Sequence, residues 1–271
     1  MRNLLASVAL ALSAVLSAPA AVAQPSIEPA AAVQDGPAKA WLVADLDTGR
    51  ILAAKDGTGS YAPASTIKPL LAMVVLDNLR PDNFARANAS HTKVECSCVG
   101  LTPGQPYSVQ ELLSALIMVS GNDAANMLAD MLGGQAVAVA AMNRKAASIG
   151  ATSTRAGSPS GLDGPGWEST TTPRDLAVIY RNALAYPLIA AILRARTAPF
   201  PGKTLAAQNE LLDRYPGDIG GKTGFTNLAR KTYVGAAQRG NRRIIVVQMY
   251  GSGDLYGQAT DLLDWGFSQY A

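Results

Sequence analysis

Histidine is almost absent from the sequence: a single residue, His91, occurs in 271 positions. A hydrolytic zinc site usually takes two or three histidines, or a cysteine set with metal-ligand spacing. A Ser-His-Asp triad would have to use His91 itself. A nucleophilic serine in this chain is therefore expected to find its base in another type of residue.

Cysteine and clustered positive charge are also scarce. The two cysteines, Cys96 and Cys98, stand one residue apart in "VECSCVG". An exported chain could join them, but such a small ring is expected to be strained, so we leave their redox state open and expect a surface-loop feature without a catalytic role. The net charge is +3 and no basic run stands out, so nucleic acid is not expected as a partner.

The rest of the composition is typical of a globular protein. Hydrophobic residues make up 48% of the chain and charged residues 16%, which suits a sizeable core in one domain with two lobes. No repeat of fixed period is visible. We expect the domain to cover residues 38–271.

The N-terminal residues have the pattern of an export signal. Residues 1–23, "MRNLLASVALALSAVLSAPAAVA", combine one arginine, an apolar centre and small residues at Ala21 and Ala23. This predicts a signal peptide cleaved after Ala23, since the apolar run is short for a membrane span. Residues 24–37 are expected to form a flexible leader. The mature protein is then exported to the periplasm or the cell-wall space, without a stable membrane anchor.

Periodicity predicts strands at both ends of the chain and helices between them. "AKAWLVADLDTGRILAAKD" indicates a β-hairpin that turns at Asp47–Gly49. Residues 108–193 have mostly helical apolar spacing. Strands are predicted in "GGKTGFTN", "ARKTYVGAAQR" and "RRIIVVQMYGS", and a helix in "DLYGQATDLLDWGFSQY". We therefore expect an α/β protein whose antiparallel sheet is flanked by helices from the terminal segments, with an inserted all-helical lobe.

The first candidate motif is Ser65 and Lys68, at the start of "STIKPLLAMVVLDNL". We expect residues 65–79 to form one buried helix, where side chains three apart lie about 60° apart around the axis and ~4.5 Å apart along it. The amine could accept the hydroxyl proton if burial and a neighbouring cation lower its pKa. A helix cap beside an exposed lysine is the alternative. A second S-x-x-K copy, Ser90–Lys93, lies in a polar stretch and is expected to be a solvated loop.

Two further motifs lie in the second half of the chain. Ser120-Gly121-Asn122 falls between two helical stretches, where the serine could relay a proton and the amide could hold a peptide; plain helix punctuation is the alternative. Lys222-Thr223-Gly224 begins a predicted strand after two glycines. It offers a cation, a hydroxyl and bare backbone to a substrate carboxylate and peptide, although a protective edge lysine would look the same.

In order and spacing, these three motifs resemble the superfamily of penicillin-binding proteins and serine β-lactamases. The resemblance is closest to low-molecular-mass D-alanyl-D-alanine carboxypeptidases of the S11 type, and covers roughly Pro37 to Ala271. The resemblance includes "SGLDGPG", "TTPRDLA" and "GGKTGFTNLAR".

This resemblance implies an enzyme that removes the terminal D-alanine from peptidoglycan stem peptides through an acyl-enzyme. It also implies covalent binding of β-lactams, and no metal or cofactor.

The resemblance also implies a role for each residue. Ser65 is then the nucleophile, Lys68 its general base and Ser120 a proton relay. Asn122 binds the substrate backbone. Lys222 lowers the pKa of Lys68 and holds the terminal carboxylate with Thr223. Gly224 allows close approach of the substrate, and the N–H groups of Ser65 and Phe225 form the oxyanion hole.

Two departures bear on the subgroup, and three other functions stay open. Pro69 follows Lys68 directly, as in larger transpeptidases. The chain ends without the β-rich domain and amphipathic tail of some carboxypeptidases, so no anchor of that kind is expected.

A DD-endopeptidase or transpeptidase would share the same motifs. In a class A β-lactamase, a glutamate is usually followed four residues later by asparagine, whereas Thr172 follows Glu168. A non-catalytic cell-wall binding protein is the alternative of a different class.

Overall fold

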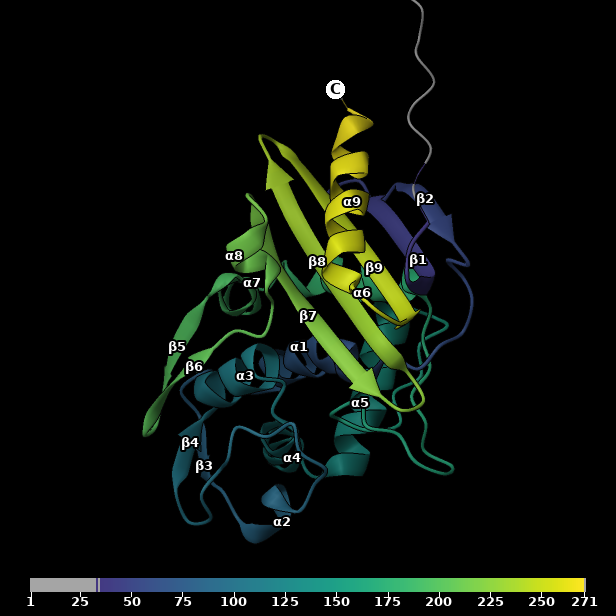
Figure 1. The fold of residues 1–271 in the computed structure, drawn as a ribbon. Coiled ribbons are helices and arrows are strands. Elements are labelled where there is room, and N and C mark those ends of the chain that lie inside the picture. The colour runs from purple at the N-terminus through teal and green to yellow at the C-terminus, as the bar shows by residue number, and fades with distance from the viewer. Residues whose placement is uncertain (1–32, 34, 271) are drawn as a thin grey trace, which may run out of the picture. The chain divides into compact units, whose positions relative to one another are not determined.

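The computed structural model describes residue 33 and residues 35–270. The expected signal peptide, residues 1–23, and most of the expected leader, residues 24–37, lie outside the described residues. The main feature is a five-stranded antiparallel sheet with the strand order β2-β1-β9-β8-β7 (Figure 1). The strands are β1 (Ala38–Asp45), β2 (Ile51–Lys55), β7 (Asp218–Thr226), β8 (Arg230–Arg239) and β9 (Arg242–Gly251).

The central strands are apolar on both faces, and each face packs against a hydrophobic core. Val43 and Ile244 belong to the core that also contains Leu262 of α9 (Leu255–Ser268). Their strand neighbours Leu42 and Ile245 belong to the larger core on the other face. Since successive side chains of a strand point to opposite faces, the run "IIVVQM" can supply both cores. The expected sheet built from the two ends of the chain, with helices on its faces, is confirmed.

The segment inserted between β2 and β7 contains most of the helices. Most of residues 108–193, where helical apolar spacing was predicted, are indeed helical. The helices are α1 (Lys68–Asn78), α3 (Val109–Met118), α4 (Asn122–Met131), α5 (Gln135–Ser148), α6 (Pro173–Ala183) and α7 (Pro187–Arg194). Helix α1 contacts α3, α5 and α6, and all its residues from Lys68 to Val75 are buried. A helix that is apolar all round needs such a setting.

The insert is not wholly helical, so this part of the prediction is wrong. It contains two short antiparallel strand pairs, β3 (Phe84–Arg86) with β4 (Pro106–Ser108) and β5 (Thr197–Phe200) with β6 (Lys203–Ala206), and the one-turn helices α2 (Ala89–Thr92) and α8 (Leu211–Arg214). Strands of three or four residues are too short to give a periodic signal in the sequence.

The helix expected over residues 65–79 begins as a 3₁₀ turn, η1 (Ala64–Ile67), which passes into α1 at Lys68. Pro69 is the cause. An α-helix would need its N–H to reach the carbonyl of Ser65, and proline has none. The N–H of Lys68 donates to Ser65 O instead, which is the tighter i→i+3 pattern.

No single helix among the described residues combines the length and the apolar composition that crossing a membrane requires. One bent pair, α6 with α7, passes only when the two are taken together, and they are bent by 107°.

Candidate active site

Ser65 and Lys68 meet at the junction of η1 and α1. Lys68 Nζ lies 2.6 Å from Ser65 Oγ. Lys68 is fully buried, whereas Ser65 is partly exposed and lines a cleft. The hydroxyl is thus open to a ligand from the side of the cleft, while the amine behind it is shielded from water.

The surroundings of Lys68 favour its neutral form. Burial lowers the pKa of Lys68 well below its ordinary value, the positive charge of Lys222 lowers it further, and the carboxylate of Asp123 acts in the opposite direction. Burial also lowers the pKa of Lys222 to about 7. A neutral amine at hydrogen-bond distance from a hydroxyl is the arrangement of a base beside its nucleophile.

The turn between α3 and α4 brings Ser120 and Asn122 to the same amine. Lys68 Nζ donates to Asn122 Oδ1 at 2.8 Å and lies 3.3 Å from Ser120 Oγ. Both residues are buried and border the cleft. Ser120 has a φ of 61°, a left-handed conformation that a residue with a Cβ rarely adopts. Such strain persists where the surroundings fix the geometry, and it is common at functional sites.

Strand β7 forms the opposite wall of the cleft and carries the third motif. Lys222 lies in the middle of the strand rather than at its start, is buried, and donates from Nζ to the carbonyl of Thr223 at 2.8 Å. Thr223, Gly224 and Phe225 line the cleft, and Phe225 is 61% exposed. β7 is the last strand in the sheet order, so one of its edges is not paired with another strand of this sheet.

Gly224 is required by the close packing of β7 against η1. A Cβ at this position would lie 2.8 Å from the backbone nitrogen of Ser65 and 2.5 Å from Thr232 Oγ1. Any side chain would force the strand away from the serine. The glycine therefore keeps the edge of the strand next to the hydroxyl.

The cleft has a volume of about 750 Å³, which suits a small-molecule or peptide ligand. Sequence reasoning identified six of the residues that line it and missed the others. The lining includes the predicted Ser65, Ser120, Asn122, Thr223, Gly224 and Phe225, and also Glu95, Cys96, Ser97, Leu162, Gln208, Glu210, Arg214, Lys231, Thr232, Tyr233, Gly253, Asp254, Leu255 and Tyr256.

Cys96 and Cys98 form a disulfide, which the sequence left open. Cys96 and its neighbours Glu95 and Ser97 border the cleft, so this loop belongs to the site rather than to a remote surface. In the sequence, only the predicted signal peptide together with the pair of cysteines favoured a disulfide.

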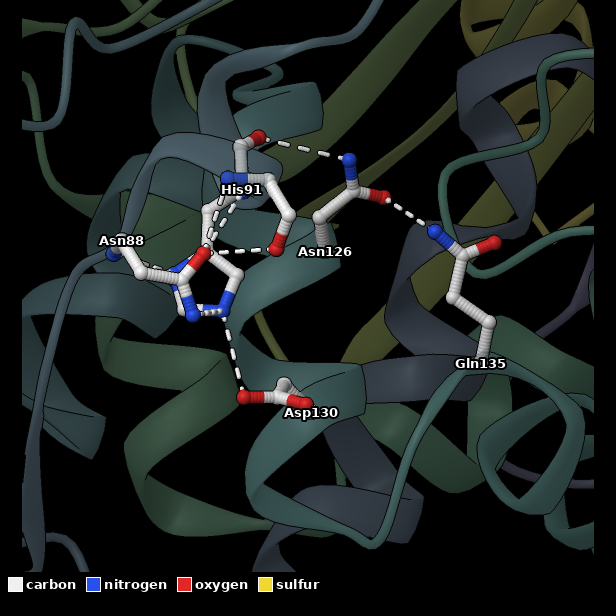
Figure 2. Close-up of polar contacts among 6 residues, drawn as sticks. Asn88, His91, Asn126, Asp130 and Gln135 are labelled. Atoms are coloured by element: carbon white, nitrogen blue, oxygen red, sulfur yellow. Dashed lines mark hydrogen bonds and ion pairs between the residues drawn. The ribbon is translucent and has the colours of Figure 1, made fainter.

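The second S-x-x-K copy is exposed at Ser90 and Lys93, as expected, but it is not a loop throughout. Ser90 and His91 lie in the one-turn helix α2, and the His91 side chain is buried. Figure 2 shows the polar contacts of this histidine. The N–H of Asn88 donates to His91 Nδ1, and His91 Nε2 lies 3.2 Å from Asp130 Oδ2. Ser90 Oγ donates to Asn88 Oδ1. The histidine was mispredicted because its partner Asp130 is 39 positions away in the sequence.

Glu168, the residue considered for a β-lactamase, accepts a hydrogen bond from the N–H of Gly166 at 3.1 Å and is not one of the residues that border the cleft. Among the described residues, no group of three or more histidine, cysteine, aspartate or glutamate side chains could hold a metal ion.

Comparison with known proteins identifies the family. Residues 27–253 match the family model of D-alanyl-D-alanine carboxypeptidases, Peptidase_S11. The chain is 52% identical over 257 residues to D-alanyl-D-alanine carboxypeptidase DacB2 of Mycobacterium tuberculosis, covering 91% of this chain and 88% of the relative.

Two solved structures show the same fold. A D-alanyl-D-alanine carboxypeptidase from Mycobacterium tuberculosis superposes with a TM-score of 0.87 at 51% identity, covering 91% of this chain and 96% of the other. The Streptomyces K15 DD-transpeptidase gives a TM-score of 0.82 at 27% identity, covering 88% and 99%. The chain therefore belongs to the D-alanyl-D-alanine carboxypeptidase family of serine peptidases.

Proposed function

We propose that this chain is a serine D-alanyl-D-alanine carboxypeptidase that removes the C-terminal D-alanine from peptidoglycan stem peptides. The observation that carries the proposal is the buried amine of Lys68, 2.6 Å from Ser65 Oγ, with its pKa lowered by burial and by Lys222. No cofactor takes part in the proposed reaction.

In the first step, neutral Lys68 takes the proton of the Ser65 hydroxyl as Oγ attacks the carbonyl of the scissile bond. Ser120, 3.3 Å from the same amine, passes the proton to the nitrogen of the leaving D-alanine. Water then attacks the acyl-enzyme, gives its proton to the base, and restores the hydroxyl of Ser65. A β-lactam would acylate the same oxygen and leave slowly.

The substrate is proposed to lie extended along the free edge of β7. Its terminal carboxylate would contact Lys222 and Thr223, and the amide of Asn122 would hold its backbone from the other wall. The N–H groups of Ser65 and Phe225 would stabilise the oxyanion, because developing negative charge is best met by fixed backbone donors. The close approach at Gly224 supports this placement.

Labelling with a fluorescent penicillin tests the assignment of the nucleophile. We expect Ser65→Ala to abolish labelling and Ser90→Ala, the matched serine of the other S-x-x-K copy, to leave it intact. Intact mass followed by peptide mapping should place the modification on Ser65. A folded wild-type protein that is never labelled would instead favour a non-catalytic cell-wall binding protein.

A comparison of substrates separates the peptidase from a β-lactamase. We expect release of D-alanine from a peptide ending in D-Ala-D-Ala, and only slow turnover of a chromogenic cephalosporin. Fast multiple turnover of the cephalosporin without release of D-alanine would overturn the proposal. Adding an amine acceptor peptide measures transpeptidation, and a cross-linked peptide substrate measures endopeptidase activity.

Export is part of the proposal, because the substrate lies outside the cytoplasm. Residues 1–23 are proposed to be removed as a signal peptide, leaving residues 24–37 as a leader before a peptidase domain over residues 38–271. The mass of the protein recovered from the envelope or the medium of an expressing cell should match an N-terminus at Gln24. Recovery of the uncleaved chain with Met1 would contradict it.

A further inference from the structure

The loop that contains the disulfide is fixed to the turn that carries Asn122. The N–H of Asn122 donates to the carbonyl of Ser97 at 2.6 Å, and Asn122 Nδ2 donates to the carbonyl of Glu95 at 2.7 Å. In return, Ser97 Oγ donates to the carbonyl of Val119 at 3.2 Å. Three hydrogen bonds thus connect residues 95–97 with residues 119–122.

These contacts decide which way the Asn122 amide points. A backbone carbonyl accepts only from the NH₂ end of the amide, so Glu95 O fixes Nδ2 on its own side. The oxygen of the same amide is then directed at Lys68 Nζ, 2.8 Å away. The carbonyl groups of Glu95 and Ser97 therefore act on Lys68 through Asn122.

The disulfide ring encloses Ser97, whose carbonyl is one of these two groups, and follows directly after Glu95, which carries the other. Cys96 and Cys98 flank Ser97, and their Cα atoms are 4.8 Å apart. No helix or strand holds residues 93–100 in shape, so the covalent ring replaces the support that a regular element would give. Rigid supporting shells of this kind hold catalytic groups in position.

The downstream half of the loop has a separate anchor. The buried carboxylate of Asp123 accepts the N–H groups of Val99, Gly100 and Leu101 at 2.9, 2.8 and 3.0 Å. Opening the disulfide would leave these bonds in place. In addition, a ring closed by neighbouring residues restrains the unfolded chain little, so its effect on global stability is expected to be small.

From this arrangement we propose that the Cys96–Cys98 disulfide positions Asn122, and through it Lys68, for acylation. The proposal rests on the proposed function. It treats the disulfide as a positioning element, since neither sulfur contacts the reacting atoms. Reduction with dithiothreitol breaks the S–S bond and adds two electrons and two protons, which gives two thiols while the reagent closes into its own cyclic disulfide.

The test measures the second-order rate constant of Ser65 acylation by a fluorescent penicillin in the mature enzyme. Reduction is expected to lower this rate about tenfold, because small misplacements of catalytic groups are costly. The Cys96→Ser/Cys98→Ser variant should show the lowered rate from the start and no response to dithiothreitol. The thermal midpoint should change by only a few degrees.

The Asn122→Ala background distinguishes positioning from a general structural role. If the disulfide acts through Asn122, reduction has no further effect in this variant, because the two changes remove the same interaction. An equal rate loss in both backgrounds, a rate within twofold of wild type after reduction, or unfolding on reduction would each overturn the inference. Failure of the oxidised wild type to become labelled would instead refute the proposed function.

Discussion

Two buried amines control protonation in the cleft. Lys68 and Lys222 both lie inside the protein, and the charge of Lys222 is the second cause, after burial, of the lowered pKa of Lys68. Like charges at close range disfavour one another. The cation at position 222 therefore helps to keep the other amine available as a base.

Lys222→Met is expected to shift the pH dependence of acylation. Without the neighbouring cation the pKa of Lys68 rises, so the acid limb of the rate profile moves to higher pH. The second-order rate constant of acylation reports the pKa values of ionising groups in the free enzyme. Measuring penicillin acylation from pH 5 to 10 therefore tests the expected shift. Lys231→Met, which removes another lysine bordering the cleft, should leave the limb in place.

Asp218, at the start of β7, is expected to lower stability at neutral pH. Burial raises its pKa to about 6, and its buried Oδ2 has no hydrogen-bond partner among the described residues. The unfolded chain loses this proton near pH 4 and the folded protein near pH 6, so the free energy of unfolding falls as pH rises through this window.

Asp218→Asn should therefore stabilise the protein by about 1–3 kcal/mol at pH 7.5 and have little effect at pH 4. Denaturant unfolding at the two pH values gives the comparison, with Asp261→Asn on the exposed face of α9 as the control. A stabilisation of the same size at both pH values would show that ionisation of Asp218 is not the cause.

At the scale of secondary structure, the site depends on how closely β7 approaches η1. Gly224→Ala is expected to reduce penicillin acylation at least about a hundredfold, because its methyl group would lie 2.8 Å from Ser65 N and displace the strand from the nucleophile. Thermal unfolding should still be cooperative, since the contact is local. A rate within fivefold of wild type would mean that the strand can yield without loss of geometry.

The site could be predicted from the sequence where its chemistry is local. Ser65 and Lys68 are one turn apart. The pair Ser120 and Asn122, and the pair Lys222 and Thr223, each lie within three consecutive positions. The 3₁₀ turn that precedes α1 follows from the missing N–H of Pro69, which our helix prediction did not take into account. The disulfide loop and buried His91 could not be found in this way, because Asn122, Asp123 and Asp130 fix them from more than 20 positions away.

At the scale of the whole chain, the sheet unites segments that are distant in sequence. Strand β1 pairs with β9 about 200 residues later, and α9 lies across this junction (Figure 1). The order of strands and helices along the chain was enough to predict this, because two terminal strand regions around a helical insert have few other ways to cover their apolar faces.

At Gly266, helix α9 packs closely against the sheet. A Cβ there would lie 2.8 Å from Ile244 Cγ2 and 2.9 Å from Val43 Cγ1. Gly266→Leu should lower the free energy of unfolding by about 2–3 kcal/mol through overpacking, measured by denaturant unfolding. Asp261→Leu, on the exposed face of the same helix, should change it by less than about 0.5 kcal/mol. Equal effects of the two leucines would contradict the close contact.

The free edge of β7 also sets a limit on how this protein could evolve under antibiotic pressure. If inhibitors and natural peptides are both held by peptide N–H and C=O groups, as proposed, those groups are present with every residue type except proline, which lacks the N–H. No other single substitution can delete them. Resistance would then require a different path of the β7 backbone or a narrower cleft. Either change would also hinder binding of the natural peptide substrate.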